Sequence, residues 1–216
     1  MIVTKQKNFD DMLASLGSGK RVFLIGCGEC ATVCKTGGET ELVELKARFE
    51  ASGKEVTGTH VPKAPCSAAS IKFVFVKDRK AIESSDSVIV FACGLGVQSV
   101  KENMRFDKPV HVGCDTLFMT TVDSKGNFFE RCSACGDCML ELSGSICPVT
   151  RCPKSLMNGP CGGQNKGKCE VNSERDCAWI LIYNELKKKG RLDFIKTIRP
   201  PRDHSKSTKP REVVKG

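Results

Sequence analysis

The sequence predicts an α/β fold, namely a Rossmann-like domain with a mainly parallel sheet, followed by a small Cys-rich, metal-organised domain and a C-terminal helix. Strand-like runs alternate with helical stretches over residues 20–118, which predicts a parallel sheet. From Cys132 onward the chain has dense cysteines, many Gly and Pro and little periodicity, so we expect metal to organise it in place of a large apolar core. The predicted divisions are an N-terminal segment 1–19, an α/β domain 20–118, a Cys-rich domain 119–190 and a basic, disordered tail 191–216.

The α/β domain begins with Arg21–Ile25, a short apolar run that ends at a glycine. Gly38–Gly53 has apolar residues at helical spacing and is expected to be a helix. The later elements expected are strands at Glu55–His60, Ser87–Ala92 and Lys108–Val112, and a short helix at Gln98–Met104.

Two further segments have helical character. Residues 67–84 are ambiguous, because IKFVFV alternates like a strand whereas KDRKAIESS continues like a helix, and we expect a helix. Ala178–Lys189 predicts an amphipathic helix whose apolar face packs on its own domain in preference to a partner. That face is formed by Trp179, Ile182, Tyr183 and Leu186.

Cysteine content indicates metal chemistry. The chain has 14 Cys but only 3 His. The N-terminal residues MIVTKQKNFDDMLASLG have no apolar signal region, and no run approaches the roughly 18 apolar residues of a membrane span. We therefore expect a cytoplasmic protein with reduced thiols, and all-sulfur ligation favours iron–sulfur clusters or zinc.

Net charge does not indicate a nucleic-acid-binding body. Residues 187–216 have eleven Lys/Arg and three Asp/Glu, so this segment supplies +8 of the net +9. The rest of the chain is close to neutral, and with 1 Trp and 1 Tyr it lacks a platform for stacking bases. We expect the tail to be solvated, and its removal after Ile198 to leave the metal content unchanged.

The first set of cysteines follows the predicted strands. Because ligands of an open parallel sheet bind beyond the carboxyl ends of its strands, we expect six cysteines from four loops to converge at one edge. Five are candidate ligands of a [4Fe–4S] cluster, whereas Cys114 suits a buried structural role. The candidates are Cys27, Cys30, Cys34, Cys66 and Cys93, of which either Cys66 or Cys27 completes the set.

A nucleotide-binding loop is the competing interpretation of the same region. Gly26-x-Gly28-x-x-Ala31 after a strand imitates a dinucleotide fingerprint, and Gly94-x-Gly96 imitates it again. Cysteines occupy the first loop, however, and no acidic residue ends the second strand to hold a ribose, so we disfavour nucleotide binding.

The second set of cysteines is denser. Its CxxCxxC start resembles the loop that binds three corners of a cubane in bacterial ferredoxins, but the assignment of the following Cys-Pro is open. Eight thiolates allow two four-sulfur sites, which can be two clusters or one cluster and a zinc. The candidate ligands are Cys132, Cys135, Cys138, Cys147, Cys152, Cys161, Cys169 and Cys177.

The string CSACGDCMLELSGSICPVTRCPKSLMNGPCGGQNKGKCEV, followed by Cys177-Ala-Trp179, resembles the C-terminal domain of the methylenetetrahydrofolate reductase family. GCGECATVCKTGGE and ACGLGVQ are similar to its small accessory subunit, and together the likeness covers about residues 20–190. The resemblance implies two or three [4Fe–4S] clusters, or a zinc in place of one, and no flavin in this chain. It also implies a flavin-containing catalytic partner, with further electron-donor subunits as additional candidates, in one-carbon metabolism.

We therefore expect a non-catalytic electron-transfer subunit of a hetero-oligomeric oxidoreductase. No catalytic residues are expected, because the sequence has no P-loop, no HExxH motif and no nucleophilic triad. The alternative is a zinc-stapled scaffold or a nucleic-acid-binding module that uses the basic tail.

Overall fold

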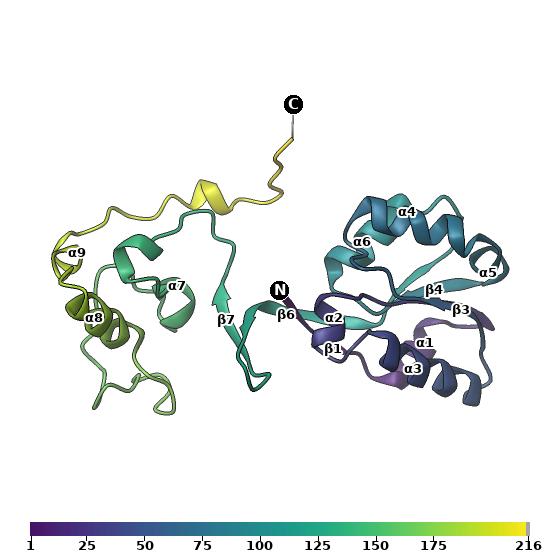
Figure 1. Cartoon of the computed structure of the whole chain (residues 1–216), viewed down its shortest axis with the longest axis horizontal. Coiled ribbons are helices and arrows are strands. Elements are labelled where there is room, and N and C mark those ends of the chain that lie inside the picture. The colour runs from purple at the N-terminus through teal and green to yellow at the C-terminus, as the bar shows by residue number, and fades with distance from the viewer. Residues whose placement is uncertain (215–216) are drawn as a thin grey trace. The chain divides into compact units, whose positions relative to one another are not determined.

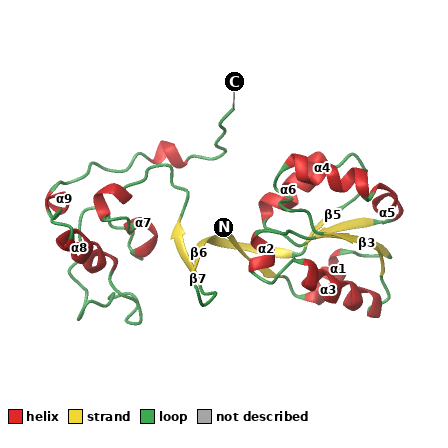
Figure 2. Cartoon of the chain, viewed as in Figure 1, coloured by secondary structure: helices red, strands yellow, loops and turns green. Residues whose placement is uncertain are grey.

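The structure, a computed structural model, describes residues 1–214, which divide into two compact units, Met1–Phe118 and Met119 onward. The first unit is built of helices and strands, and most of the second is loop (Figure 2). Among residues 1–214, no helix combines the length and the apolar character needed to cross a bilayer.

A four-stranded parallel sheet forms the centre of the first unit. Its strands are β2 (Arg21–Ile25), β3 (Glu55–His60), β4 (Ser87–Val90) and β5 (Val110–Val112). Their order is β3-β2-β4-β5, and all three neighbouring pairs are parallel. The predicted α/β class with a mainly parallel sheet is confirmed, and each of these strands lies within a predicted run.

Helices cover both faces of this sheet (Figure 1). One face packs against α1 and α3 and the other against α4, α5 and α6. The bounds are α1 Phe9–Ser15, α3 Glu39–Ala51, α4 Ala68–Lys77, α5 Arg79–Ser84 and α6 Gly94–Asn103, with a single turn, α2, at Cys30–Val33.

Alternating side chains of the central strands explain this two-sided cover. In β2, Val22 and Leu24 pack with α1 and α3, whereas Phe23 and Ile25 pack with the opposite helices. All four are at most 1% exposed. Continuous apolar runs are typical of parallel strands that are buried on both faces. Burial on both faces therefore explains why the segments RVFLI and SVIVFA are almost entirely apolar.

The ambiguous segment 67–84 is helical, as expected. Ile71, Val74 and Phe75 are buried in α4 at helical spacing, whereas Phe73 is 61% exposed. The apparent strand alternation of IKFVFV therefore comes from a helix with one apolar face and two additional exposed apolar residues, Phe73 and Val76.

A second sheet was not predicted. It has the order β1-β6-β7, with β1 at Ile2–Gln6, β6 at Cys114–Val122 and β7 at Phe128–Cys132. Strand β6 runs across the boundary of the two units and pairs antiparallel with β7. Residues 1–19, predicted as a segment outside the α/β domain, belong to the first unit and form β1 and α1. Asn8 caps α1 by accepting a hydrogen bond from the Asp10 N–H at 2.9 Å.

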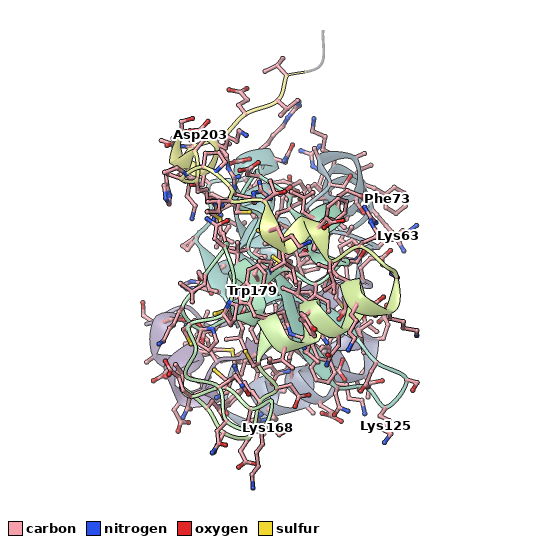
Figure 3. The ribbon with its side chains drawn as sticks, turned by 90° about the vertical axis from the view of Figure 1, so that its left-hand side faces the viewer. Lys63, Phe73, Lys125, Lys168, Trp179 and Asp203 are labelled. Atoms are coloured by element: carbon pink, nitrogen blue, oxygen red, sulfur yellow. The ribbon has the colours of Figure 1, made fainter. Side chains whose placement is uncertain are left out.

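The second unit has short helices and a small core. Its helices are η1 Leu140–Ser143, α7 Pro148–Arg151, α8 Ala178–Lys188, α9 Asp193–Lys196 and η2 His204–Ser207. On α8, Trp179, Ile182 and Leu186 are buried within the unit, whereas Tyr183 is 42% exposed. Trp179 (labelled in Figure 3) also donates from its Nε1 to the Leu156 carbonyl at 2.9 Å. Most of the apolar face of α8 therefore packs on its own unit.

A close backbone approach beside the sheet gives a stability prediction. A Cβ at Gly37 would collide with the carbonyl of Phe91, so Gly37→Ala is expected to lower the free energy of unfolding by about 1–3 kcal/mol. Gly94→Ala is the control, since its Cβ would lie 3.5 Å from Thr116 Oγ1, an ordinary contact. Urea unfolding of both variants measures the difference, and equal stabilities would contradict the packing described here.

Candidate metal centres

All fourteen cysteines are free thiols, so none of them is held in a disulfide. In the first unit, all six follow the carboxyl ends of the parallel strands. Cys27 and Cys30 come after β2, Cys66 after β3 and Cys93 after β4, where it is the N-cap of α6. Strands β2, β3 and β4 therefore deliver five thiols to the same edge of the sheet, and β5 delivers Cys114 there.

Electrostatic coupling shows which of these thiols lie near one another. The pKa of Cys66 is raised, first by burial and then by the nearby sulfurs of Cys93, Cys27 and Cys30. Mutual repulsion of thiolates is the state that a bound cation relieves, because a metal favours the deprotonated ligands. We call the five predicted ligands, Cys27, Cys30, Cys34, Cys66 and Cys93, the sheet-edge group.

Strand β1 contributes a polar contact that the sequence did not indicate. The backbone N–H of Ile2 donates to Cys30 Sγ at 3.4 Å, and Cys34 Sγ lies 3.7 Å from the carbonyl of the same residue. An N–H group directed at a sulfur stabilises its thiolate form. The amino-terminal strand thus holds both cysteines of the α2 turn beside the sheet edge.

Cys114 differs from the sheet-edge group in its surroundings. Its side chain is 1% exposed and lies 3.6 Å from the Thr36 carbonyl, to which the thiol donates. Burial raises its pKa to about 12, so it is a neutral thiol at physiological pH. This setting suits the structural role proposed for Cys114 from sequence.

Burial of Cys114 leads to a labelling prediction. In the folded chain at pH 8 we expect iodoacetamide to leave Cys114 unmodified, because the reagent reaches only exposed thiolates. Exposed Cys138 in metal-free protein is the positive control. Peptide mass spectrometry before and after unfolding in urea measures both sites. Equal alkylation of the two in folded protein would contradict a buried structural thiol.

In the second unit, residues 132–138 form a compact loop. Ala134 and Gly136 have φ of 51° and 80°, and the Ala134 N–H donates to Cys132 Sγ at 3.3 Å. Left-handed residues let a short loop turn its backbone donors toward a thiolate sulfur. The CxxCxxC segment therefore turns so that one backbone N–H, that of Ala134, is directed at a cysteine sulfur.

Cys147 is attached to the same region. It is the N-cap of α7, where Pro148 occupies the first turn. The hydroxyl of Thr150 in α7 donates to the Arg131 carbonyl at 3.0 Å, which ties this helix to the residue preceding Cys132. Cys147 is thus tied to the region of the CxxCxxC loop, and we call Cys132, Cys135, Cys138 and Cys147 the loop group.

The remaining four cysteines surround one small cavity. Its volume is about 20 Å³, and its walls include Trp179 at the start of α8. The loop is folded locally, since Cys169 N–H donates to the Arg175 carbonyl at 2.9 Å and Cys177 N–H to the Gly167 carbonyl at 2.8 Å. We call these cysteines the cavity group: Cys152, Cys161, Cys169 and Cys177.

The thiols are grouped but are not at ligand distance from one another. In the part of the chain that the structure describes, no three His, Cys, Asp or Glu side chains form a ready metal-binding group. The three cysteine groups nevertheless fit a thiophilic metal, because all their donors are sulfur atoms and none is held in a disulfide. Their loops can move the sulfurs to ligand distance when a metal binds. The ligand assignments therefore stay predictions.

An α/β unit followed by a loop-rich unit with two groups of four cysteines defines a class of thiol-rich, metal-binding candidates. Residues 111–205 match the family described as "Methylene-tetrahydrofolate reductase C terminal". The resemblance of the cysteine-rich half to this family is confirmed for that segment, which includes the loop and cavity groups. It also extends into the basic tail, beyond the end of the likeness seen in the sequence. No curated protein and no solved structure gave a match.

Sequence reasoning missed the residues that contact the thiol loops from elsewhere in the chain. Ile2 acts through its backbone, so no side-chain pattern could reveal it. Arg202 and Arg211 donate to carbonyls of the 132–138 loop from a segment expected to be disordered. The positive charge of Arg202 and Arg211 was the only feature of the sequence that could have indicated these contacts. Charge dispersed among Pro, Ser and Thr is usually solvated, so it did not predict them.

Proposed function

We propose that the chain is the iron–sulfur subunit of a methylenetetrahydrofolate reductase complex and passes electrons to the flavin of a partner catalytic subunit. The family match over residues 111–205, which contains eight of the cysteines in two groups, is the observation that carries the proposal. Bound clusters supply one-electron transfer, a chemistry that needs no acid or base from the protein.

The chain's own residues position such clusters and shield them. In the first unit the sheet-edge thiols are fixed by buried strands and by the backbone of Ile2. The proposal assigns one [4Fe–4S] cluster to this group and a second to the loop group, where the Ala134 N–H is a donor to sulfur.

Zinc is favoured in the cavity group. A cavity of about 20 Å³ is little more than the space of one water molecule, which suits a single ion better than an eight-atom cubane. Tetrahedral Cys₄ zinc is a closed structural site, and the buried Trp179 beside the cavity agrees with a structural role. This assignment gives two clusters and one zinc per chain.

Anaerobic purification followed by iron, sulfide and zinc analysis tests the metal assignment. The expected result is a brown protein with about eight irons and one zinc per chain. The matched variants Cys135→Ser and Cys161→Ser should lose iron and zinc, respectively. A colourless protein that contains only zinc would establish the scaffold alternative in place of the proposal.

Electron relay has a separate test. The purified chain is mixed with the flavoprotein recovered with it from the native host, and flavin reduction by an electron donor is followed by stopped-flow absorbance. Reduction should be fast with the chain and slow without it. Equal rates would exclude relay and leave a role in stabilising the partner.

A further inference from the structure

The basic tail contacts the loop that holds three cysteines of the loop group. Arg202 Nη2 donates to the Cys135 carbonyl at 3.0 Å, and Arg211 Nη1 donates to the Ala134 carbonyl at 2.7 Å. Lys206 Nζ lies 3.3 Å from Asp137 Oδ1. Three cations of one segment therefore contact Ala134, Cys135 and Asp137, which all lie in the loop 132–138.

The contact extends to the backbone. A Cβ at Gly136 would lie 2.7 Å from the carbonyl oxygen of Lys206, so the loop and the tail approach too closely to leave room for a side chain at this position. Gly136 also has a φ of 80°, which favours glycine. The loop is thus shaped to receive the tail.

A second anchor fixes the start of this segment. The side chain of Asn158 accepts from the Arg199 N–H at 2.8 Å and donates to the Arg199 carbonyl at 3.0 Å. Pro200 and Pro201 follow and restrict the backbone to extended conformations. Asp203 (labelled in Figure 3) then caps η2 by accepting from the Ser205 N–H at 3.0 Å.

Two buried nitrogens in this segment have unmet donor capacity. Arg199 Nη1 and Arg202 Nε are buried and have no hydrogen-bond partner among the described residues. A buried guanidinium N–H without an acceptor is costly, and in folded proteins such groups are nearly always paired. Arg202 donates through Nη2 to the carbonyl of Cys135, so its unpaired Nε lies beside the backbone of this candidate ligand.

We infer that Arg202, Lys206 and Arg211, here called the basic clasp, close over the CxxCxxC loop and stabilise the negative charge of the metal centre bound there. The inference rests on the proposed function, because it requires a metal at the loop group. Four thiolates give a cubane a net negative charge, and neighbouring cations and N–H···S hydrogen bonds are the means by which proteins tune its potential.

These contacts and the sequence predict different results of truncating the tail after Ile198. A solvated tail could be removed after Ile198 without loss of metal, whereas a clasp could not. Each clasp cation is a positioning residue, since it acts on the loop and on the charge of the centre.

The test compares two double variants that remove equal charge. Arg202→Ala/Arg211→Ala removes both arginine contacts with the loop, whereas Lys188→Ala/Lys209→Ala removes two exposed lysines that make no hydrogen bond with it. Full-length proteins are purified anaerobically, and iron release to a chelator and the midpoint potential are measured. The arginine variant is expected to release iron about fivefold faster, because the net value of hydrogen bonds to a charged group is lost. Its potential should become more negative, because the reduced centre loses nearby positive charge.

Each outcome decides a separate claim. If the wild type contains iron at the loop group and both double variants match it in release rate and potential, the clasp is wrong and the proposed function stands. If the wild type contains no iron, both fall. If the arginine double variant is recovered without metal, the single variant Arg211→Ala, which retains the Cys135 contact, must show an intermediate release rate for the clasp to hold.

Discussion

Removal of metal is expected to unfold the second unit while the first keeps its fold. Within residues 119–214, its buried apolar cluster consists of Cys177, Trp179, Ile182 and Leu186, with six partly buried apolar side chains packed against them. Residues 152–177 are almost entirely loop between α7 and α8 (Figure 2). Ordering such a chain costs about 1–2 kcal/mol per residue, which so small a core cannot offset.

The first unit provides an internal control for this prediction. Its sheet has a buried apolar cluster on each face, with Phe23, Phe49 and Phe91 completely buried. Burial on this scale stabilises a fold without metal. We therefore expect the apo-protein to retain the parallel sheet and α1–α6.

Limited proteolysis with and without chelator, under anaerobic conditions, measures the difference. After chelation, cleavage should appear first between residues 132 and 177, at sites such as Lys154, Lys166 and Arg175. Intact-mass analysis should recover a resistant fragment that contains residues 1–118. If the apo-protein resists cleavage across 132–177 as well as the loaded protein does, metal does not organise this segment.

The parallel sheet could be predicted from the sequence because burial leaves a direct mark on composition. Strand β4 lies in SVIVFA, whose residues from Val88 to Ala92 are all at most 1% exposed. Helix α3 was evident from Leu42, Leu45 and Phe49, which are buried on one face. Periodicity identifies such elements since the core selects apolar residues at their spacing.

The strands of the second sheet do not have such a buried, apolar composition. Most of β6 is half-exposed or exposed, as is β7, so neither has the alternation of a strand buried on one face. Strand β1 was short and mixed in character. Their pairing depends on contacts between distant parts of the chain, which local patterns do not encode.

The candidate sites divide in the same way. Cysteine spacing identified all the thiols, and strand ends placed the sheet-edge group. The division of the later eight into a loop group and a cavity group needed the structure, because it depends on the tie between Thr150 and Arg131 and on the walls of one cavity.

Cys93→Ser is expected to remove about four irons per chain, the content of one cubane. Cys93 is 9% exposed at the N-cap of α6, directly after the central strand β4. After burial, its sulfur is the largest cause of the raised pKa of Cys66, and it also contributes to the raised pKa of Cys114. It therefore lies among the sheet-edge thiols, and a serine oxygen there is a poor ligand for iron.

Cys114→Ser is the matched control, because it makes the same change at a buried thiol, at the start of strand β6. A serine hydroxyl can keep the hydrogen bond to the Thr36 carbonyl, so the fold should tolerate it. This variant should retain the iron content of the wild type.

Iron and sulfide analysis of the two variants, with circular dichroism to verify folding, decides the ligand assignment. The loop and cavity groups should keep their metal in both, since they belong to the other unit. Loss of four irons from Cys114→Ser with full content in Cys93→Ser would place the cluster on the β5–β6 side of the sheet edge. The buried thiol of Cys114 would then be a ligand, and its neutral, structural role would be wrong.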